Sequence, residues 1–139
     1  IRDLVRSRGL GDVYKRQIGY MCLLICMLLP IFWAGVSKYG YGDIKYDNES
    51  PRDHLSSLSG KAKNAYNAEQ NCYETFPAFA AAVIIAHQIG NDQFMINMLC
   101  VVFLLTRILH GYFYITNKGS LRSIVFVLGL ITNIWLFFV

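Results

Sequence analysis

Polar side chains recur on one face of a stretch of the chain with helical spacing. They follow one another at steps of three, four and three residues: Asn64, Asn67, Asn71 and Glu74. Residues three and four apart on a helix project from the same face, so these amides and the carboxylate form one polar stripe. Such a stripe can bind a ligand, or it can hold helices or subunits together.

A second stripe supplies positive charge. Arg107, His110 and Tyr114 stand at i, i+3 and i+7, and Arg122 follows across a short turn. Two guanidinium groups on faces of this kind indicate an anion site. The alternatives are structural. Glu74, paired with Arg107 or with the asparagines of its own stripe, would fix the helix bundle or an oligomer. His110 would be a hydrogen-bonded interior residue, and Tyr114 would belong to the aromatic belt of a membrane interface.

The composition places both stripes in a membrane protein. The chain has 139 residues, enough for one domain, and 55% of them are hydrophobic. Charged residues make up 16%, whereas soluble domains carry about 25%. Ile18 to Val36 has no charged residue, and Phe94 to Ile115 carries only Arg107. A helix that crosses a bilayer needs roughly 20 such residues, so a water-soluble enzyme is disfavoured and no strongly basic surface for nucleic acid remains.

Four segments are predicted to be membrane helices, at about 18–37, 62–89, 93–115 and 120–139. Lipid offers no partners to free backbone groups, and these runs do not alternate like barrel strands, so we predict an all-α, four-helix integral membrane bundle. Short turns after the second and third segments make the last three helices consecutive antiparallel neighbours. Ala78, Ala81 and Ala82 form a small-residue strip where another helix is expected to approach closely.

The distribution of Lys and Arg predicts the orientation. The first connection carries Lys38, Lys45, Arg52, Lys61 and Lys63, the second carries none, and the third carries Lys118 and Arg122. By the positive-inside rule, the first and third connections are cytoplasmic and both termini face the opposite compartment.

Residues 1–17 conflict with that orientation. They contain five basic and two acidic residues, which give +3 of the formal charge of +4. The tract resembles translated sequencing adapters found ahead of unrelated reading frames, and we expect it to be a non-native leader, with 18–139 as the native domain. The alternative is the basic region of a signal peptide, but the apolar run that follows is longer than such peptides carry.

All four cysteines fall inside the membrane segments. They are Cys22, Cys26, Cys72 and Cys100, and none belongs to a short motif outside the membrane. A free cysteine in such a place behaves as a small buried apolar residue. Neither a disulfide framework nor a metal site is therefore predicted.

The run Asn71-Cys72-Tyr73-Glu74-Thr75-Phe76-Pro77-Ala78-Phe79 is similar to the N-x-x-E-x-F-P-x-F signature in the second helix of the MAPEG family, the membrane-associated proteins in eicosanoid and glutathione metabolism. Arg107, Tyr114 and the turn Leu121-Arg122-Ser123 look like that family's later positions, so the resemblance covers 18–139. It implies a homotrimer in the bilayer, here of a bacterial branch and hence of an inner membrane. In catalytic members, glutathione binds between subunits toward the cytoplasmic side.

The resemblance also implies roles for the stripe residues. Glutathione would be the co-substrate of a transferase or peroxidase, and a lipophilic electrophile would arrive from the bilayer. Arg122 would stabilise the thiolate, because positive charge lowers a thiol pKa from its usual value of about 8.5. Arg107 would bind a peptide carboxylate, while Asn71 and Glu74 would hold the amide and ammonium groups. Tyr114 would donate a hydrogen bond, and His110 would complete the substrate-binding set.

Departures from the family pattern keep a second interpretation open. Catalytic members carry arginines where this chain has Asn64 and Asn67, and a tyrosine where it has His110. The bacterial branch is largely without assigned activity. The alternative is a non-catalytic membrane protein in which the same polar residues tie three subunits together.

Overall fold

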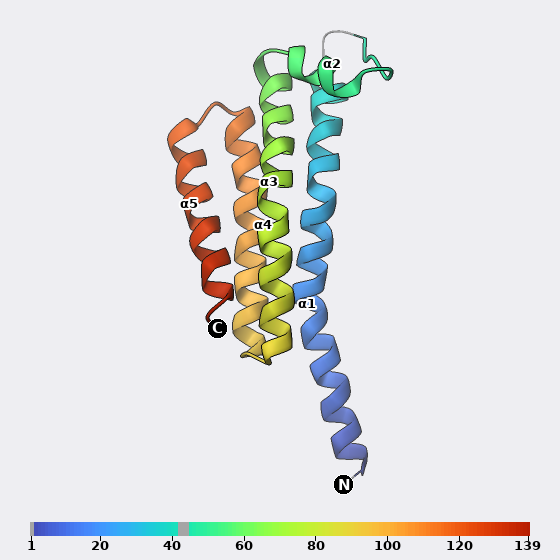
Figure 1. The fold of residues 1–139 in the computed structure, drawn as a ribbon, viewed down its shortest axis with the longest axis vertical. Coiled ribbons are helices and arrows are strands. Elements are labelled where there is room, and N and C mark those ends of the chain that lie inside the picture. The colour runs from blue at the N-terminus through green and yellow to red at the C-terminus, as the bar shows by residue number, and fades with distance from the viewer. Residues whose placement is uncertain (1, 42–44) are drawn as a thin grey trace.

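The computed structural model describes residues 2–41 and 45–139, and its regular elements in these ranges are all helices (Figure 1). In chain order they are α1 (Arg2–Gly35), a short π-helical turn η1 (Val36–Gly40), α2 (Pro51–Ser57), α3 (Gly60–Ile89), α4 (Gln93–Ile115) and α5 (Gly119–Leu136). The all-α prediction is confirmed.

Three of these helices are long and apolar enough to cross a bilayer. The spans are Tyr14–Gly40, Gln93–Ile115 and Gly119–Leu136, with mean hydropathies of 2.1, 1.8 and 1.5. The chain is therefore an integral membrane protein. The helix α3 is not among these three, because its first half carries the polar stripe. That α3 is a fourth membrane crossing stays a prediction.

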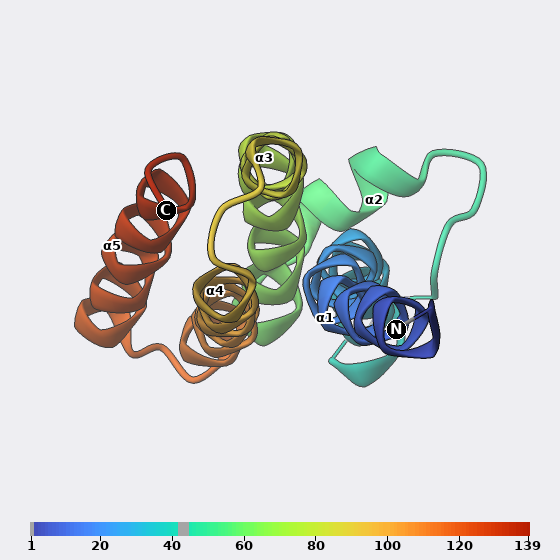
Figure 2. The ribbon, with the colours of Figure 1, turned by 90° about the horizontal axis from the view of Figure 1, so that it is seen from below.

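The long helices pack side by side. Seen along the bundle, α1, α3 and α4 pack against one another, and α5 lies on the far side of α4 from α1 (Figure 2). The first turns of α1 extend beyond the end of the other helices (Figure 1). The sequence predicted a first helix from residue 18, but α1 begins at Arg2, because Lys, Arg and Gln before Ile18 are good helix formers that continue an apolar helix outward.

The first and third connections lie at the same end of the bundle, and the α3–α4 turn lies at the other (Figure 1). Asn64 Nδ2 donates to Asn117 Oδ1 at 2.8 Å, which joins the start of α3 to the α4–α5 turn. The buried hydroxyl of Ser37 donates to the Ala62 carbonyl at 2.8 Å, which joins η1 to α3. This common end agrees with the charge argument, whereas the compartment that it faces stays a prediction.

Small and aromatic side chains fill the interior. The rings of Phe79 and Phe103 stack at 4.0 Å between centroids, tying α3 to α4. Of the predicted alanine strip, Ala82 is buried within the chain, whereas Ala78 and Ala81 are exposed on its surface, and the approach of another helix to them stays a prediction. The alanines that the bundle buries follow the period of the helix: Ala62, Ala65, Ala68, Ala82 and Ala86.

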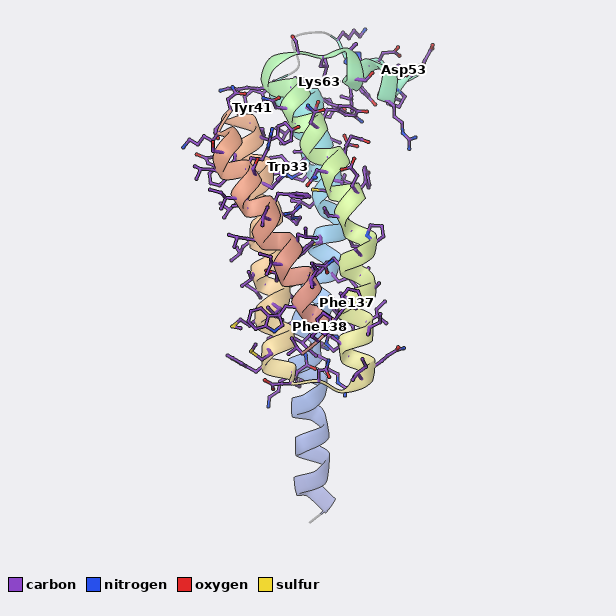
Figure 3. All side chains as sticks on the ribbon, turned by 60° about the vertical axis from the view of Figure 1, so that its left-hand side comes forward. Trp33, Tyr41, Asp53, Lys63, Phe137 and Phe138 are labelled. Carbon is purple, nitrogen blue, oxygen red and sulfur yellow. The ribbon has the colours of Figure 1, made fainter. Side chains whose placement is uncertain are left out.

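Glycine permits one close helix crossing. A Cβ on Gly111 of α4 would overlap the indole ring of Trp33 on α1, so only a glycine accommodates this contact. Trp33 lies within the bundle, whereas Phe137 and Phe138 lie near the end of the chain (Figure 3). The indole is 5% exposed, and its packing fixes α1 against α4.

Large apolar side chains cover the outside of α1, α4 and α5. Examples are Phe32, Leu105, Ile131 and Trp135, all exposed. In water such a surface would be unstable, but a bilayer is an apolar solvent that matches it. The polar side chains of these helices must therefore face inward.

Candidate functional site

An outer cavity of about 480 Å³ lies between α3, α4 and α5, in the half of the bundle nearer α2. Its lining comprises Asn67, Gln70, Asn71, Glu74, His110, Tyr114, Arg122, Ser123, Phe126 and Val127. Five of the six site residues predicted from the sequence thus meet in one space: Asn71, Glu74, His110, Tyr114 and Arg122. The sixth, Arg107, lies behind this cavity.

The helical period explains what α3 contributes. Asn67, Asn71 and Glu74 are three and four residues apart, so they turn to the same side of α3. Gln70 stands four residues before Glu74 and joins them. Asn64, the first member of the predicted stripe, bonds to Asn117 and does not line the cavity.

Arg107 is buried, with 3% of its surface exposed. Its Nη1 donates to Asn71 Oδ1 at 3.0 Å, and its Nη2 reaches the Val125 carbonyl at 3.5 Å. The rings of Phe103 and Phe126 lie 5.3 and 5.5 Å from the guanidinium carbon, close enough for cation–π attraction. The partner of Arg107 is therefore Asn71, where the sequence suggested Glu74, and the guanidinium links α3, α4 and α5.

Gly129 makes room for this guanidinium. A Cβ at Gly129 would lie 2.5 Å from Arg107 Nη2 and 2.7 Å from Thr106 Oγ1. Both distances are shorter than real Cβ contacts, so a larger residue would displace Arg107. The close approach of α5 to α4 at this point thus depends on a glycine.

The remaining cavity cation is Arg122. Its guanidinium lies 4.4 Å from the centre of the Tyr114 ring, within range of a cation–π contact. Arg122 is partly exposed, so the Tyr114 ring holds the cation at the wall without enclosing it. His110 is buried and meets Tyr114 edge to face at 5.6 Å.

Two further cations lie near the start of α3 but do not line the cavity. Lys61 lies over the ring of Tyr41, and Lys63 lies over the ring of Tyr66. The labelled Tyr41 and Lys63 appear at the α2 end of the bundle (Figure 3). The lysines therefore do not replace the arginines that the family carries at Asn64 and Asn67.

A smaller inner pocket adjoins the outer cavity deeper in the bundle. Its volume is about 150 Å³, and its lining comprises Glu74, Thr75, Ala78, Phe103, Arg107, Phe126, Leu130 and Asn133. Glu74 and Phe126 line both spaces. Arg107 and Glu74 thus line a common space, although Glu74 itself is exposed on the single chain.

Sequence reasoning missed several lining residues. Ser123 and Phe126 follow Arg122 by one and four residues, so their place on the same helix face was available from the spacing. Asn133 carried a stronger signal, because an amide inside an apolar span is costly without a partner. The partner or ligand of that amide cannot be read from spacing alone.

The four cysteines are free and buried. Within residues 14–41 and 45–139, whose side chains the structure describes, no three His, Cys, Asp or Glu side chains gather closely enough to hold a metal ion.

Comparison with protein families matches residues 18–139 to the family described as MAPEG family. Comparison with curated proteins and with solved structures gave no match. The family match begins at Ile18 and covers every residue of the two spaces described above.

Proposed function

Because the chain belongs to the MAPEG family, we propose that it is a membrane-embedded transferase that binds glutathione in the outer cavity and joins its thiol to a lipophilic electrophile. One observation carries the proposal: three helices bring a cation, a carboxylate, amides and a phenol into a single cavity of about 480 Å³. Ligand sites of small molecules fall in the range of about 300–1,000 Å³.

The side chains of the cavity suit the groups of the tripeptide. Glu74 is acidic and would pair with the glutathione ammonium group, and Asn71 would bind a peptide amide. The cation of Arg122 would lower the thiol pKa and stabilise the thiolate. Tyr114 would donate a hydrogen bond from its place under Arg122, and the buried His110 supports its ring.

The reaction would proceed by displacement. The thiol loses its proton to solvent, the sulfur lone pair forms a bond to the electrophilic carbon, and the leaving group departs with its bonding pair. In the peroxidase version, two thiols are oxidised to one disulfide while a hydroperoxide is reduced to an alcohol and water. In both versions Arg122 would act on the sulfur, which makes it the catalytic residue of the proposal.

Arg107 would act differently from the role implied by the family resemblance. Its donors already bond to Asn71 and to the Val125 carbonyl, so it would orient Asn71 and add positive charge behind the cavity. Direct binding of a peptide carboxylate in the outer cavity is disfavoured, because Arg107 is buried and does not line that cavity.

We propose further that the protein is a homotrimer of a bacterial inner membrane, with the first and third connections in the cytoplasm. The outer cavity lies in the half of the bundle near these connections, as the proposed access of a cytoplasmic thiol requires. Reporter fusions at each terminus test the orientation, and a cytoplasmic C-terminus would contradict it.

Titration calorimetry of glutathione into the detergent-solubilised protein tests the binding step. Conjugation is then measured with 1-chloro-2,4-dinitrobenzene, from which a thiolate displaces chloride. We expect a rate above background for the wild type and its loss in Arg122→Ala. Arg52→Ala, which removes an exposed arginine of α2, is the matched control and should keep the wild-type rate. If the wild type and both variants all react at the uncatalysed background rate, the proposed transferase activity is refuted.

The second candidate function is a non-catalytic trimer held together by its polar residues. The bonds of Arg107 to α3 and α5 support a structural role for the polar residues, because this cation ties helices of the same chain together. Glu74→Gln separates the two: a structural role predicts loss of the trimer in mild detergent. A ligand role predicts an intact trimer with weaker glutathione binding.

A further inference from the structure

A buried histidine, His87, lies near the end of α3 that is farthest from the outer cavity (Figure 1). Only 7% of its surface is exposed. Its ring stacks on Tyr20 of α1, with 4.7 Å between the centroids. Gly19 leaves room for the ring, because a Cβ there would lie 2.8 Å from His87 Cε1. The imidazole is therefore held in one place between α1 and α3.

The hydrogen bonds of this ring determine where its proton lies. Nδ1 lies 2.7 Å from the Val83 carbonyl, and a carbonyl oxygen can only accept, so Nδ1 carries a hydrogen. A neutral imidazole has one N–H, so Nε2 is an acceptor, and the Gln93 amide donates to it at 3.1 Å. The same amide nitrogen donates to Asn97 Oδ1 at 2.9 Å. A chain of hydrogen bonds thus runs from His87 through Gln93 to Asn97.

Protonation of His87 would reverse this chain. An imidazolium donates from both nitrogens, so the new hydrogen on Nε2 would face the hydrogens of the Gln93 amide. Half a turn of that amide presents its oxygen to His87, and Asn97 must then turn as well and donate from Nδ2. Within the part of the chain that the structure describes, no further hydrogen bond holds either amide in place. Both protonation states of His87 can therefore be fully hydrogen-bonded.

A polar cavity of about 200 Å³ gives protons access to the ring. Its lining comprises Arg16, His87, Gly90, Asn91 and Gln93. The titratable groups on the elements around the ring are Arg16 and Tyr20 of α1, Asp92 of the α3–α4 turn and Cys100 of α4. Phenols and thiols are uncharged near neutral pH, which leaves the opposite charges of Arg16 and Asp92. The three residues of the chain lie within the family match, so the chain does not depend on the tract before Ile18.

We propose that His87 is a proton-binding site and that Gln93 relays its protonation to Asn97 by reversing the chain of hydrogen bonds. The group that Asn97 turns away from the chain then changes from a donor to an acceptor. A charge gained inside the bundle thus alters the hydrogen bonding of a half-buried residue on α4. This pH-sensitive device is independent of the proposed glutathione chemistry.

NMR of the ¹⁵N-labelled protein in detergent micelles tests the proton-binding site. The chain has three histidines, so replacing His54 and His110 one at a time assigns the ring signals of His87 without changing it. At about pH 8 the ring should be neutral with its hydrogen on Nδ1, and at about pH 5 it should be an imidazolium, because histidines usually titrate between these values. A neutral ring with its hydrogen on Nε2, or a ring that is still neutral at about pH 5, would overturn the inference.

The side-chain amide signals of Asn97 test the relay in the same titration. In the wild type they should shift together with the protonation of His87. Gln93→Leu should abolish this shift and lower the midpoint of the His87 titration by about one pH unit, because the imidazolium loses its acceptor. Gln88→Leu makes the same change on an exposed residue outside the cavity lining and should alter neither. Asn97 signals that do not follow His87 in the wild type, or equal effects of the two variants, would contradict the relay.

Discussion

Replacing Gly129 with alanine should destabilise the bundle through Arg107. The new Cβ would lie 2.5 Å from Nη2, whereas ordinary contacts are about 3.5 Å, so the guanidinium must move by about 1 Å. That shift would lengthen its 3.0 Å bond to Asn71 to about 4 Å, beyond hydrogen-bonding range. Losing a bond to a charged group costs about 1.5–3 kcal/mol, and overpacking costs about 1–3 kcal/mol. The better helix propensity of alanine offsets about 1 kcal/mol. We expect a net loss of about 1.5–5 kcal/mol.

Unfolding by titration with dodecyl sulfate, followed by tryptophan fluorescence, measures this loss. Gly35→Ala is the matched control, because Gly35 has helical backbone angles and no side chain of the described residues lies within 4 Å of the position that the new methyl group would take. It should be neutral or gain up to about 1 kcal/mol. In an Asn71→Ala background, Gly129→Ala should cost less, because the bond that it breaks is already absent. Equal stability of Gly129→Ala and Gly35→Ala would refute the steric argument.

Three further changes test the packing. Gly111→Ala should cost about 1–3 kcal/mol by overpacking against Trp33 and shift the tryptophan emission, and an unchanged spectrum would contradict the close crossing. Ser37→Ala removes the hydrogen bond that joins η1 to the Ala62 carbonyl of α3 and should cost about 0.5–1.5 kcal/mol in the same titration. Ser56→Ala on the exposed side of α2 should stay within about 0.5 kcal/mol, and equal losses would argue against the η1–α3 link. Asn133→Leu removes an unsatisfied amide and should be neutral or stabilising by about 1 kcal/mol, and a large loss in the titration would mean that the amide serves packing.

The sequence was sufficient for the helices and for most of the outer cavity. Apolar runs predicted where α4 and α5 lie, and the steps of three and four residues placed Asn71 beside Glu74 on α3. These features are local, since they follow from helical periodicity and from the solvent around the bundle. The short helix α2 was missed inside the first connection, although Pro51 at its first turn is a recognised start signal.

The spacing of residues along the sequence does not predict which group each long polar side chain bonds to. Arg107 could extend toward Glu74 or toward Asn71 from the same backbone position. The choice depends on Gly129, which is 22 residues away in sequence and opens the space that the guanidinium occupies. In the same way, the side chain of Asn64 bonds to Asn117 in the α4–α5 turn and does not line the cavity with the rest of its stripe. Such contacts depend on tertiary packing and not on local pattern.

The bond between Arg107 and Asn71 also fixes which way round the Asn71 amide stands. A guanidinium has no acceptor, so the group that receives its hydrogen bond must be the oxygen of the amide. The nitrogen is then the end left for the outer cavity, and it offers only hydrogens. A molecule bound beside Asn71 has to present a lone pair there, such as that of a peptide carbonyl or a hydroxyl, and one presenting only N–H donors at that point would be disfavoured.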